Sequence, residues 1–381
     1  MRYARDRGDN GFVQRFDTDA WGSCRSPEGH KAGRGIRYCR LEKLHNLHPE
    51  EKTLHMMLAT IADGSADGRL VVVSRDHTRC LPAVAPTLQA AIEHWQEVSP
   101  QLQAQAERLA NGTGEPLQDR ELRAPLPRAW QWLDGSAFPS HGALMQQAFK
   151  LKPIETDRPL MYQGLSHQFL GPREDVPLPS ETDGIDFEGE FGVITDAVPM
   201  GVAAADAFKH IRLIVQLNDW SLRTLAPVEM KTGFGWIQAK PACSMAPVAV
   251  TPDELGTAWR DGRVCLPLEV SWNGKPFGHP NGEAMAFGFQ DLIAHAAATR
   301  SLCAGTIIGS GTVSNTNHQE VGSTCIAERR GIEMIRDGAP RTEFMRFGDS
   351  VRMEARRLDS GPLFGVIEQQ VVQARPGQAS A

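Results

Sequence analysis

The pattern of residues 185–194 limits the possible folds of this chain more than any other segment. Its sequence, Ile-Asp-Phe-Glu-Gly-Glu-Phe-Gly-Val-Ile, alternates in the way that a β-strand requires. Phe187 and Phe191 therefore share one face of the strand, and Glu188 and Glu190 share the other. Two carboxylates at this spacing lie about 7 Å apart and repel each other unless a cation lies between them. The alternation predicts either a solvated polar face or a cation site.

A third carboxylate ends a second expected strand. In residues 211–219 the alternation places Asp219 on the same face as Leu213, Val215 and Leu217. Burying a carboxylate beside such an apolar face is costly unless the carboxylate is paired or coordinates a metal. The alternative is an aspartate that caps a turn at the end of the strand.

Residues 134–141 add a fourth carboxylate, Asp134, and a histidine at their far end, His141. Alone this pair is weak evidence, because an aspartate near a histidine is common in loops. Together the four carboxylates form a set of oxygen ligands. Such a set suits a hard cation such as Mg²⁺ or Ca²⁺ rather than zinc.

The rest of the chain is rich in strands. Residues 57–82 predict short strands separated by Asp-Gly turns, and residues 86–110 predict a helix that Asn-Gly ends. Residues 124–127, Ala-Pro-Leu-Pro, are typical of a linker. Beyond them strands dominate, with one clear helix at about residues 290–303. This pattern predicts a β-rich α+β fold, with a small N-terminal α/β domain before a larger main domain.

We expect four regions along the chain. Residues 1–55 are rich in Arg and Gly and show no periodicity, which predicts a disordered extension or a start codon placed too far upstream. They contain no apolar segment typical of a signal peptide, and their aspartates argue against a transit peptide. We assign residues 56–125 to the small domain, residues 126–370 to the catalytic domain and residues 371–381 to a tail.

The 7 cysteines include no CxxC pair and no disulfide-like spacing, which fits a reducing compartment. We expect them to be small buried hydrophobic residues. Cys24, Cys39, His45 and His48 are zinc ligands by type, but their spacing matches no common zinc pattern. We therefore expect no zinc site in that segment.

Composition argues against several classes of protein. The formal net charge of -6 and the pI near 6.1 give no electrostatic reason to expect a nucleic-acid partner. No run of about 18 apolar residues occurs, so we expect no membrane span, and we expect a cytoplasmic location. A glycosidase built on a carboxylate pair would need sugar-stacking aromatics, and the chain has only 3 tyrosines.

Five further motifs accompany the carboxylate segments. They are Pro-Leu-Met-Tyr-Gln-Gly at 159–164, Asn-Asp-Trp-Ser-Leu-Arg at 218–223, Gln-Ala-Lys-Pro at 238–241, Gly-Ser-Gly-Thr-Val-Ser-Asn at 309–315 and Phe-Met-Arg-Phe-Gly-Asp-Ser-Val at 344–351. Together these segments resemble the fumarylacetoacetate hydrolase family, as a bacterial-type two-domain member. The resemblance runs from about residue 127 to residue 366, and it is loose over residues 57–125. It implies a mixed β-roll and β-sandwich main domain behind the small α/β domain.

The resemblance also implies a catalytic centre. One divalent cation, Mg²⁺ with Ca²⁺ or Mn²⁺ as alternatives, is held by Asp134, Glu188, Glu190 and Asp219. His141 matches the general base of the family, and Lys240 matches the lysine that lies beside the metal and faces the substrate oxygens. The positions that match the substrate side are Lys150, Tyr162, Arg223 and Thr312.

Several positions depart from the family pattern. The glutamate that orients the base in the mammalian-type enzyme has no partner in register, and Glu328, about two residues further on, is our candidate for this catalytic role. Ala226 stands where the mammalian-type enzyme has a substrate-binding glutamine, and Lys150 stands where it has an arginine. These changes leave the substrate open. We assign Asp186 to a structural or solvent-facing role.

We interpret the chain as a metal-dependent hydrolase that cleaves a C–C bond in a β-diketo acid, such as fumarylacetoacetate or an acylpyruvate, during the breakdown of aromatic compounds. His141 would take the proton from water, and Lys240 and Thr312 would stabilise the developing oxyanion. Two alternatives stay open: a keto-acid decarboxylase or tautomerase, and a non-catalytic protein that binds a metabolite on the same fold. The expected partner is a small diketo or keto acid, and the resemblance implies a homodimer.

Overall fold

The computed structural model describes residues 55–117, 122–150, 152 and 156–375. The prediction for the N-terminal extension, including Cys24, Cys39, His45 and His48, lies outside the described residues. Within the described part of the chain, no helix is long and apolar enough to cross a membrane.

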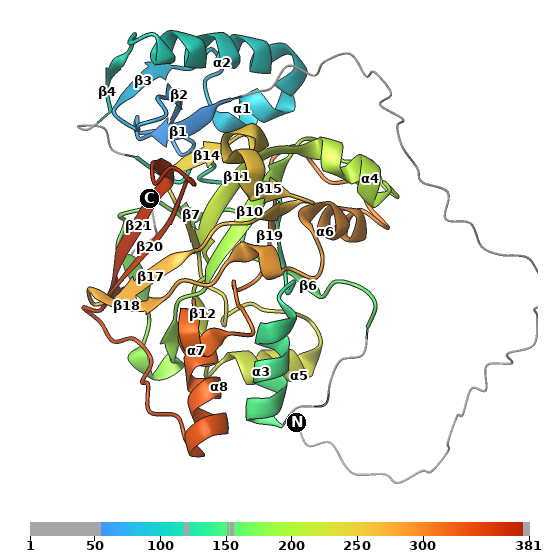
Figure 1. The fold of residues 1–381 in the computed structure, drawn as a ribbon, viewed down its shortest axis with the longest axis vertical. Coiled ribbons are helices and arrows are strands. Elements are labelled where there is room, and N and C mark those ends of the chain that lie inside the picture. Colours follow the sequence, from blue (N-terminus) through green and yellow to red (C-terminus); the bar gives the residue numbers. More distant parts are fainter. Residues whose placement is uncertain (1–54, 118–121, 151, 153–155, 376–381) are drawn as a thin grey trace, which may run out of the picture. The chain divides into compact units, whose positions relative to one another are not determined.

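Most strands belong to one 12-stranded sheet (Figure 1). Its strands are β1 (Met57–Ile61), β2 (Arg69–Val73), β3 (Arg79–Pro82), β4 (Glu115–Pro116), β5 (Trp132–Gly135), β6 (Met161–Gln163), β7 (Phe169–Leu170), β10 (Gly189–Thr195), β11 (Ile211–Asn218), β13 (Cys243–Met245), β14 (Val248–Val250) and β19 (Thr306–Gly309). The main path is β4-β3-β2-β1-β14-β11-β10-β19-β5-β6, and β13 links β7 to β11. Because β1 pairs with both β2 and β14, the N-terminal strands extend the sheet of the larger segment.

A second, five-stranded sheet has the order β18-β17-β20-β21-β8, and two short strand pairs stand apart, β9 with β12 and β15 with β16. These strands are β8 (Val176–Leu178), β9 (Ile185–Asp186), β12 (Ser221–Leu222), β15 (Trp259–Arg260), β16 (Arg263–Val264), β17 (Glu269–Trp272), β18 (Lys275–Gly278), β20 (Ser350–Arg356) and β21 (Pro362–Gln373). Asn273 and Gly274 join β17 to β18, and both have positive φ, 50° and 72°, as a tight hairpin turn requires.

Eight α-helices lie among the described residues. They are α1 (Leu88–Glu93), α2 (Trp95–Ala110), α3 (Pro139–Phe149), α4 (Ala204–Ala207), α5 (Ala226–Thr232), α6 (Phe289–Ala296), α7 (His318–Val321) and α8 (Ile326–Asp337). Short 3₁₀ helices span Glu181–Asp183, Phe208–His210, Pro252–Ala258 and Gly282–Ala284. Helices α3 and α8 lie side by side and pack against each other (Figure 1).

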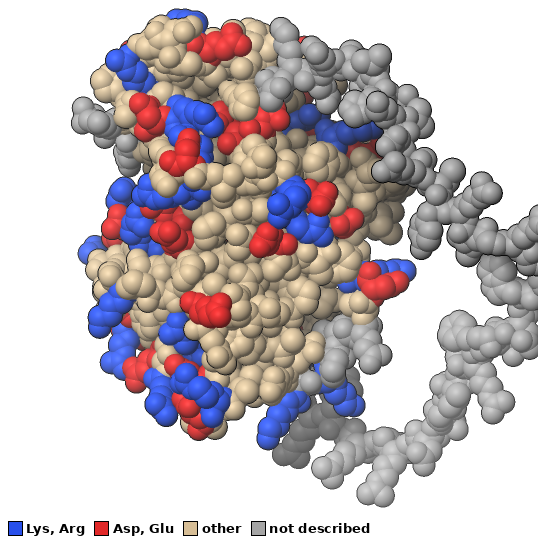
Figure 2. All heavy atoms as spheres, viewed as in Figure 1, with Lys and Arg blue, Asp and Glu red and all other residues tan. Residues whose placement is uncertain are grey.

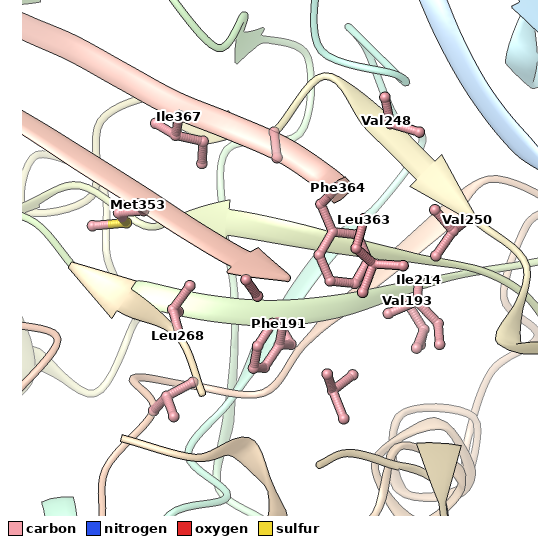
Figure 3. Close-up of a cluster of buried hydrophobic side chains, with 14 of the residues drawn as sticks. Phe191, Val193, Ile214, Val248, Val250, Leu268, Met353, Leu363, Phe364 and Ile367 are labelled. Carbon is pink, nitrogen blue, oxygen red and sulfur yellow. The ribbon is translucent and has the colours of Figure 1, made fainter. Parts of the chain in front are cut away.

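The main core fills the space between the two sheets (Figure 3). Phe191 and Val193 of β10 face this core, as the alternation of their strand predicts. Residues from the five-stranded sheet, among them Met353 and Phe364, pack against them and are fully buried. This face-to-face arrangement is a β-sandwich.

The other face of the large sheet carries a second core. Leu213, Val215 and Leu217 of β11 belong to it, together with apolar side chains of α1 and α2 such as Leu88 and Trp95. The alternation of β11 thus divides its side chains between the two cores. Asp219 follows the row that faces the second core, and this places its carboxylate at the end of a buried apolar face.

The β-rich α+β prediction is confirmed, but four details of the helices and connections were wrong. The helix expected at 86–110 is divided at His94, whose φ of -117° and ψ of 33° leave the helical region. The helix expected at 290–303 ends at Ala296. The segment 124–127 is no exposed linker, because its Ala124 and Leu126 are buried in the second core. Helices α3 and α8 were missed altogether.

The charged side chains and the cysteines can be compared with what the sequence predicts about surface charge and cysteine burial. On the face drawn in Figure 2, basic and acidic side chains of the described residues are intermixed, with no continuous basic stripe. Cys80, Cys243 and Cys325 are buried as expected, whereas Cys303 is exposed. Cys303 lies beyond the end of α6, in the segment where the predicted helix does not continue.

Candidate active site

Three predicted metal ligands meet at the end of the central strands. Asp134 lies on β5, Glu190 on β10 and Asp219 directly after β11, and one carboxylate oxygen of each lies within 4.8 Å of the other two. The strand register produces this meeting, because Gly189 pairs with Asn218 and Gly309 of β19 pairs with Asp134. We call these three residues the carboxylate cluster.

The carboxylate cluster is almost completely shielded from water. Asp134, Glu190 and Asp219 are 4%, 0% and 1% exposed, and both oxygens of Glu190 lack a hydrogen-bond partner among the described residues. Burial, followed by the charges of Asp134 and Asp219, raises the pKa of Glu190 well above its usual range. Burial and the charge of Asp219 likewise raise the pKa of Asp134 to about 8. The solvated polar face considered from sequence is therefore ruled out.

This geometry fits a hard divalent cation. Unpaired buried carboxylates are costly, and a bound cation removes that cost. Bonds of about 2.0–2.6 Å to Mg²⁺ or Ca²⁺ place oxygens on opposite sides of the ion about 4–5 Å apart, as the 4.8 Å limit of the cluster allows. The ligands are oxygens only, which also agrees with a hard cation.

Glu188 has very different surroundings. Its Oε1 accepts hydrogen bonds from Ser221 Oγ at 2.6 Å and Lys240 Nζ at 3.1 Å, and Arg223 forms an ion pair with the same oxygen at 2.5 Å. Its Oε2 accepts from Thr312 Oγ1 at 2.5 Å. Although burial opposes the shift, Arg223 and Lys240 hold the pKa of Glu188 well below its usual range.

Glu188 therefore stands outside the three-residue carboxylate cluster in this structure. Its direct ligation of the cation stays a prediction. The predicted substrate-side residues Arg223 and Thr312 lie beside the cluster through their contacts with Glu188.

Lys240 connects the carboxylate cluster to Glu188, and Tyr162 contacts the cluster beside it. Lys240 Nζ contacts Asp219 Oδ2 as well as Glu188, and lies 5.3 Å from the centre of the Tyr162 ring. Tyr162 donates a hydrogen bond to the same oxygen of Asp219 at 2.6 Å. Burial works against it, but Asp219 and Glu188 raise the pKa of Lys240 well above its usual range. Lys240 is therefore a fixed positive charge beside the carboxylate cluster.

The predicted base and its partner come from the two helices that were missed. His141 lies in the first turns of α3, and its Nδ1 is 4.0 Å from Glu328 Oε2 on α8. Glu328 is fully buried and accepts hydrogen bonds from Ser314 Oγ and from Ser323 Oγ at 2.6 Å. Burial opposes the shift, but the contact with His141 lowers the pKa of Glu328. Glu328 therefore lies close to His141, although in sequence it lies about two residues beyond the position of the glutamate that orients the base in the mammalian-type enzyme.

Asp186 is a buried link, so the structural one of the two roles assigned to it from sequence applies. It is 0% exposed, and its carboxylate accepts hydrogen bonds from the backbone N–H groups of Ile326 at 2.7 Å and Ala327 at 2.9 Å, in the first turn of α8. It also accepts from Arg223 Nε at 2.8 Å. Asp186 thus joins the helix that carries Glu328 to the arginine that faces Glu188. A signal existed, because strand alternation places Asp186, Glu188 and Glu190 on one face.

Lys150 does not join the site. It ends α3 with a left-handed backbone, φ 51°, and its side chain is exposed. Within the described part of the chain, Lys150 forms no ion pair with the carboxylate cluster or with Glu188. Its role as a substrate-side cation stays a prediction.

Solved structures share this fold. A maleylpyruvate hydrolase from Sphingobium sp. SYK-6, solved with manganese (II) and pyruvate, aligns with a TM-score of 0.57 at 19% identity, over 84% of this chain and 100% of that chain. A fumarylacetoacetate hydrolase from Exiguobacterium antarcticum aligns with a TM-score of 0.58 at 17% identity, again over 84% and 100%. A probable 2-hydroxyhepta-2,4-diene-1,7-dioate isomerase from Mycobacterium abscessus gives 0.58 at 20% identity with the same coverage, 84% and 100%. These likenesses define the class of fold and not the reaction.

Sequence comparison defines the family. Residues 131–372 match the fumarylacetoacetate (FAA) hydrolase C-terminal domain, and residues 56–128 match fumarylacetoacetase N-terminal domain 2. The chain therefore belongs to the fumarylacetoacetate hydrolase family. The 2,4-didehydro-3-deoxy-L-rhamnonate hydrolase of Sphingomonas sp. (strain SKA58) is 28% identical over 163 residues, 42% of this chain and 54% of that protein. A mitochondrial oxaloacetate tautomerase of Rattus norvegicus is 26% identical over 157 residues, 40% and 48%. The chain thus matches about half the length of these relatives.

Proposed function

We propose that this protein hydrolyses a C–C bond of a β-diketo acid with the help of one divalent cation. The observation that supports this reaction is the pairing of His141 with the buried Glu328, on the mutually packed helices α3 and α8, in a chain that also carries the carboxylate cluster. A cation site alone needs no base. A hydrolase needs one, because water must lose a proton as it attacks.

The side chains divide the chemistry as follows. A cation bound at Asp134, Glu190 and Asp219 supplies a Lewis acid that withdraws charge from the keto oxygens of the substrate. His141 takes the proton from the attacking water at Nε2, because Nδ1 is the nitrogen that faces Glu328. The negative charge of Glu328 favours a proton on Nδ1 and stabilises the imidazolium that forms.

Lys240 supports the same reaction at the carboxylate cluster. Its fixed positive charge lies next to Asp219, where an enolate leaving group would develop negative charge. Breaking the C–C bond of a β-diketo acid produces a carboxylic acid and an enolate that is protonated to a ketone. The proton that His141 receives from water is the one available for this step.

The test is a panel of acylpyruvates, fumarylacetoacetate and oxaloacetate, assayed with Mg²⁺ or Mn²⁺ and with chelator. We expect cation-dependent cleavage of at least one diketo acid, and a loss of about 10²–10⁴-fold in kcat for His141→Ala. The cation affinity of this variant should stay near that of the unsubstituted protein. His167→Ala serves as the matched control, because His167 is exposed. Turnover by His141→Ala at the parent rate would refute the assigned base.

A keto-acid tautomerase or decarboxylase is the second candidate, and similarity to the oxaloacetate tautomerase of Rattus norvegicus favours it. The same cation and Lys240 would stabilise an enolate without any attack by water. The panel separates the reactions by product: keto–enol interconversion of oxaloacetate, release of CO₂, or cleavage to two acids. Tight binding without turnover of any compound would instead indicate a metabolite-binding protein.

A further inference from the structure

A second group of possible metal ligands lies where α8 begins. His141, Cys325 and Glu328 each offer one ligand atom within 4.8 Å of the other two. They supply nitrogen, sulfur and oxygen, whereas the carboxylate cluster supplies oxygen only. Thiolate and imidazole ligands favour zinc and related thiophilic cations, whereas an oxygen-only set favours hard cations. The two groups therefore differ in the class of cation that each would select.

One ligand atom of this group has no hydrogen-bond partner among the described residues. His141 Nδ1 is buried and lacks a hydrogen-bond partner among the described residues, and it lies 4.0 Å from Glu328 Oε2. Cys325 is 0% exposed, and its Sγ accepts a hydrogen bond from the backbone N–H of Glu328 at 3.3 Å. Burial and the charge of Asp186 raise the pKa of the Cys325 thiol well above its usual range, so a bound cation must displace its proton.

Solvent reaches this group at His141, whose side chain is 17% exposed, whereas Cys325 and Glu328 are fully buried. The adjacent Ser140 lines a cavity of about 820 Å³ that is enclosed by α3, β18, α7 and α8. A tetrahedral ion with bonds of about 2.0–2.3 Å needs the three ligand atoms to approach one another by roughly 1 Å. Rotation of the partly exposed imidazole can supply that movement, and water can complete the coordination.

We propose that His141, Cys325 and Glu328 form an inhibitory site for a thiophilic divalent cation such as Zn²⁺. Neutral imidazole carries a proton on only one of its two nitrogens. A cation that binds Nδ1 leaves the ring proton on Nε2, and Nε2 then cannot accept a proton from water. The inhibition rests on the proposed function of His141, whereas the cation binding itself does not.

Cadmium binding tests the site without any measurement of activity. The full chain, saturated with Mg²⁺, is titrated with Cd²⁺ while the ultraviolet charge-transfer absorbance of cadmium–thiolate bonds is followed. We expect one saturable absorbance change that Cys325→Ser removes. Serine is a favoured N-cap residue, so this variant retains the start of α8. Cys243→Ser is the matched control, because Cys243 is equally buried and lies outside the group.

Zinc inhibition tests the consequence. With saturating Mg²⁺, micromolar Zn²⁺ should lower kcat for the diketo acid and leave KM unchanged, and a zinc chelator should restore the rate. Loss of a residue that merely supports a metal ligand weakens binding by about 10–100-fold, so loss of the thiolate ligand itself should weaken inhibition by at least about 100-fold.

The outcomes separate the two proposals. If Cys325→Ser retains the cadmium absorbance, or Cys243→Ser removes it, the second site is refuted whatever the activity. If the absorbance behaves as expected and no diketo acid is cleaved, the second site stands and the proposed function fails. If cadmium binds at Cys325 and zinc leaves kcat unchanged, the inhibitory role is wrong.

Discussion

In two neighbouring regions of the site, buried carboxylates have different partners, and their pKa values shift in opposite directions. In the carboxylate cluster, Glu190 is buried with no hydrogen-bond partner among the residues that the structure describes, and its pKa is raised. We call Asp186, Glu188 and Arg223 the ion-pair network. In this network Glu188 accepts hydrogen bonds from two hydroxyl groups and forms ion pairs with two cationic side chains, and its pKa is lowered. Glu188 and Glu190 are two residues apart in one segment. The difference therefore lies in what the rest of the fold places around each of them.

The charge count explains why a cation belongs in one region only. Among the described residues, Asp186 and Glu188 face Arg223, and the three carboxylates of the cluster face no cationic side chain besides Lys240, which the two regions share. When all five buried carboxylates are ionised, they face two cationic side chains, which leaves an excess of three negative charges. Because the network already has its own arginine, most of this excess falls on the cluster. A divalent cation there reduces it to one.

The first prediction makes the same chemical change in both regions. In Glu188→Gln, Arg223 loses one buried partner, and we expect the free energy of unfolding to fall by about 3–5 kcal/mol. Urea unfolding in the presence of chelator measures this change without any contribution from a bound cation.

Glu190→Gln is the matched variant, with the same change of charge and shape. We expect it to raise the free energy of unfolding in chelator, because it removes a buried carboxylate whose ionised form no hydrogen-bond donor stabilises among the described residues. It should also abolish stabilisation by Mg²⁺ or Mn²⁺, which amounts to about 2.7 kcal/mol at 100 times Kd. Equal destabilisation by the two variants would show that the regions do not differ.

The second prediction concerns pH. Burial and the charge of Asp219 raise the pKa of Asp134 to about 8, above its value of about 3.9 in an unfolded chain. The cation-free protein therefore has full stability from this group below about pH 4 and loses it as the pH rises through 8. The loss is at most about 1.4 kcal/mol per pH unit for each proton.

Urea midpoints measured in chelator between pH 5 and 9 test this slope. Asp134→Asn should flatten it, and so should saturating Mg²⁺, because the cation displaces the proton. Asp157→Asn, at an exposed carboxylate, should leave it unchanged. A parent protein whose stability does not vary over this range would contradict the raised pKa.

Local patterns were enough to predict the strands and the carboxylates they carry. Alternation in single segments placed Asp219 at the end of an apolar face and left the face of Glu190 open between a solvated face and a cation site; strand pairing brings the two residues together on the buried side. Helices α3 and α8 were missed because glycines interrupt them, and glycine is a poor helix former. Gly331 of α8 lies against α3, where a Cβ would be 2.8 Å from the terminal Cε of Met145, a flexible side chain that can shift.

The partners of each carboxylate depend on contacts between distant segments. Asp186 accepts hydrogen bonds from a helix that begins 140 residues later, and no local pattern shows that contact. The fold class could therefore be predicted, and so could the carboxylates that form the cluster, whereas the hydrogen bonds and ion pairs around Glu188 could not.

The smallest effects are expected when a single hydroxyl group is removed from each region. Tyr162 donates to Asp219 of the carboxylate cluster, and Thr312 donates to Glu188 of the ion-pair network. Tyr162→Phe should weaken cation binding by about tenfold, as expected for a residue that orients a metal ligand. Thr312→Val should lower the free energy of unfolding by about 1 kcal/mol and leave cation affinity nearly unchanged.

Calorimetric titration with Mn²⁺ and urea unfolding in chelator measure the two quantities for both variants. A loss of cation affinity in Thr312→Val as large as that in Tyr162→Phe would show that Glu188 is itself a ligand. In that case the cation draws Glu188 away from its present partners, and the two regions merge into one four-carboxylate site when it binds. Affinity lost in Tyr162→Phe alone would keep them separate, with Glu188 holding Lys240 and Arg223 in place beside the cation.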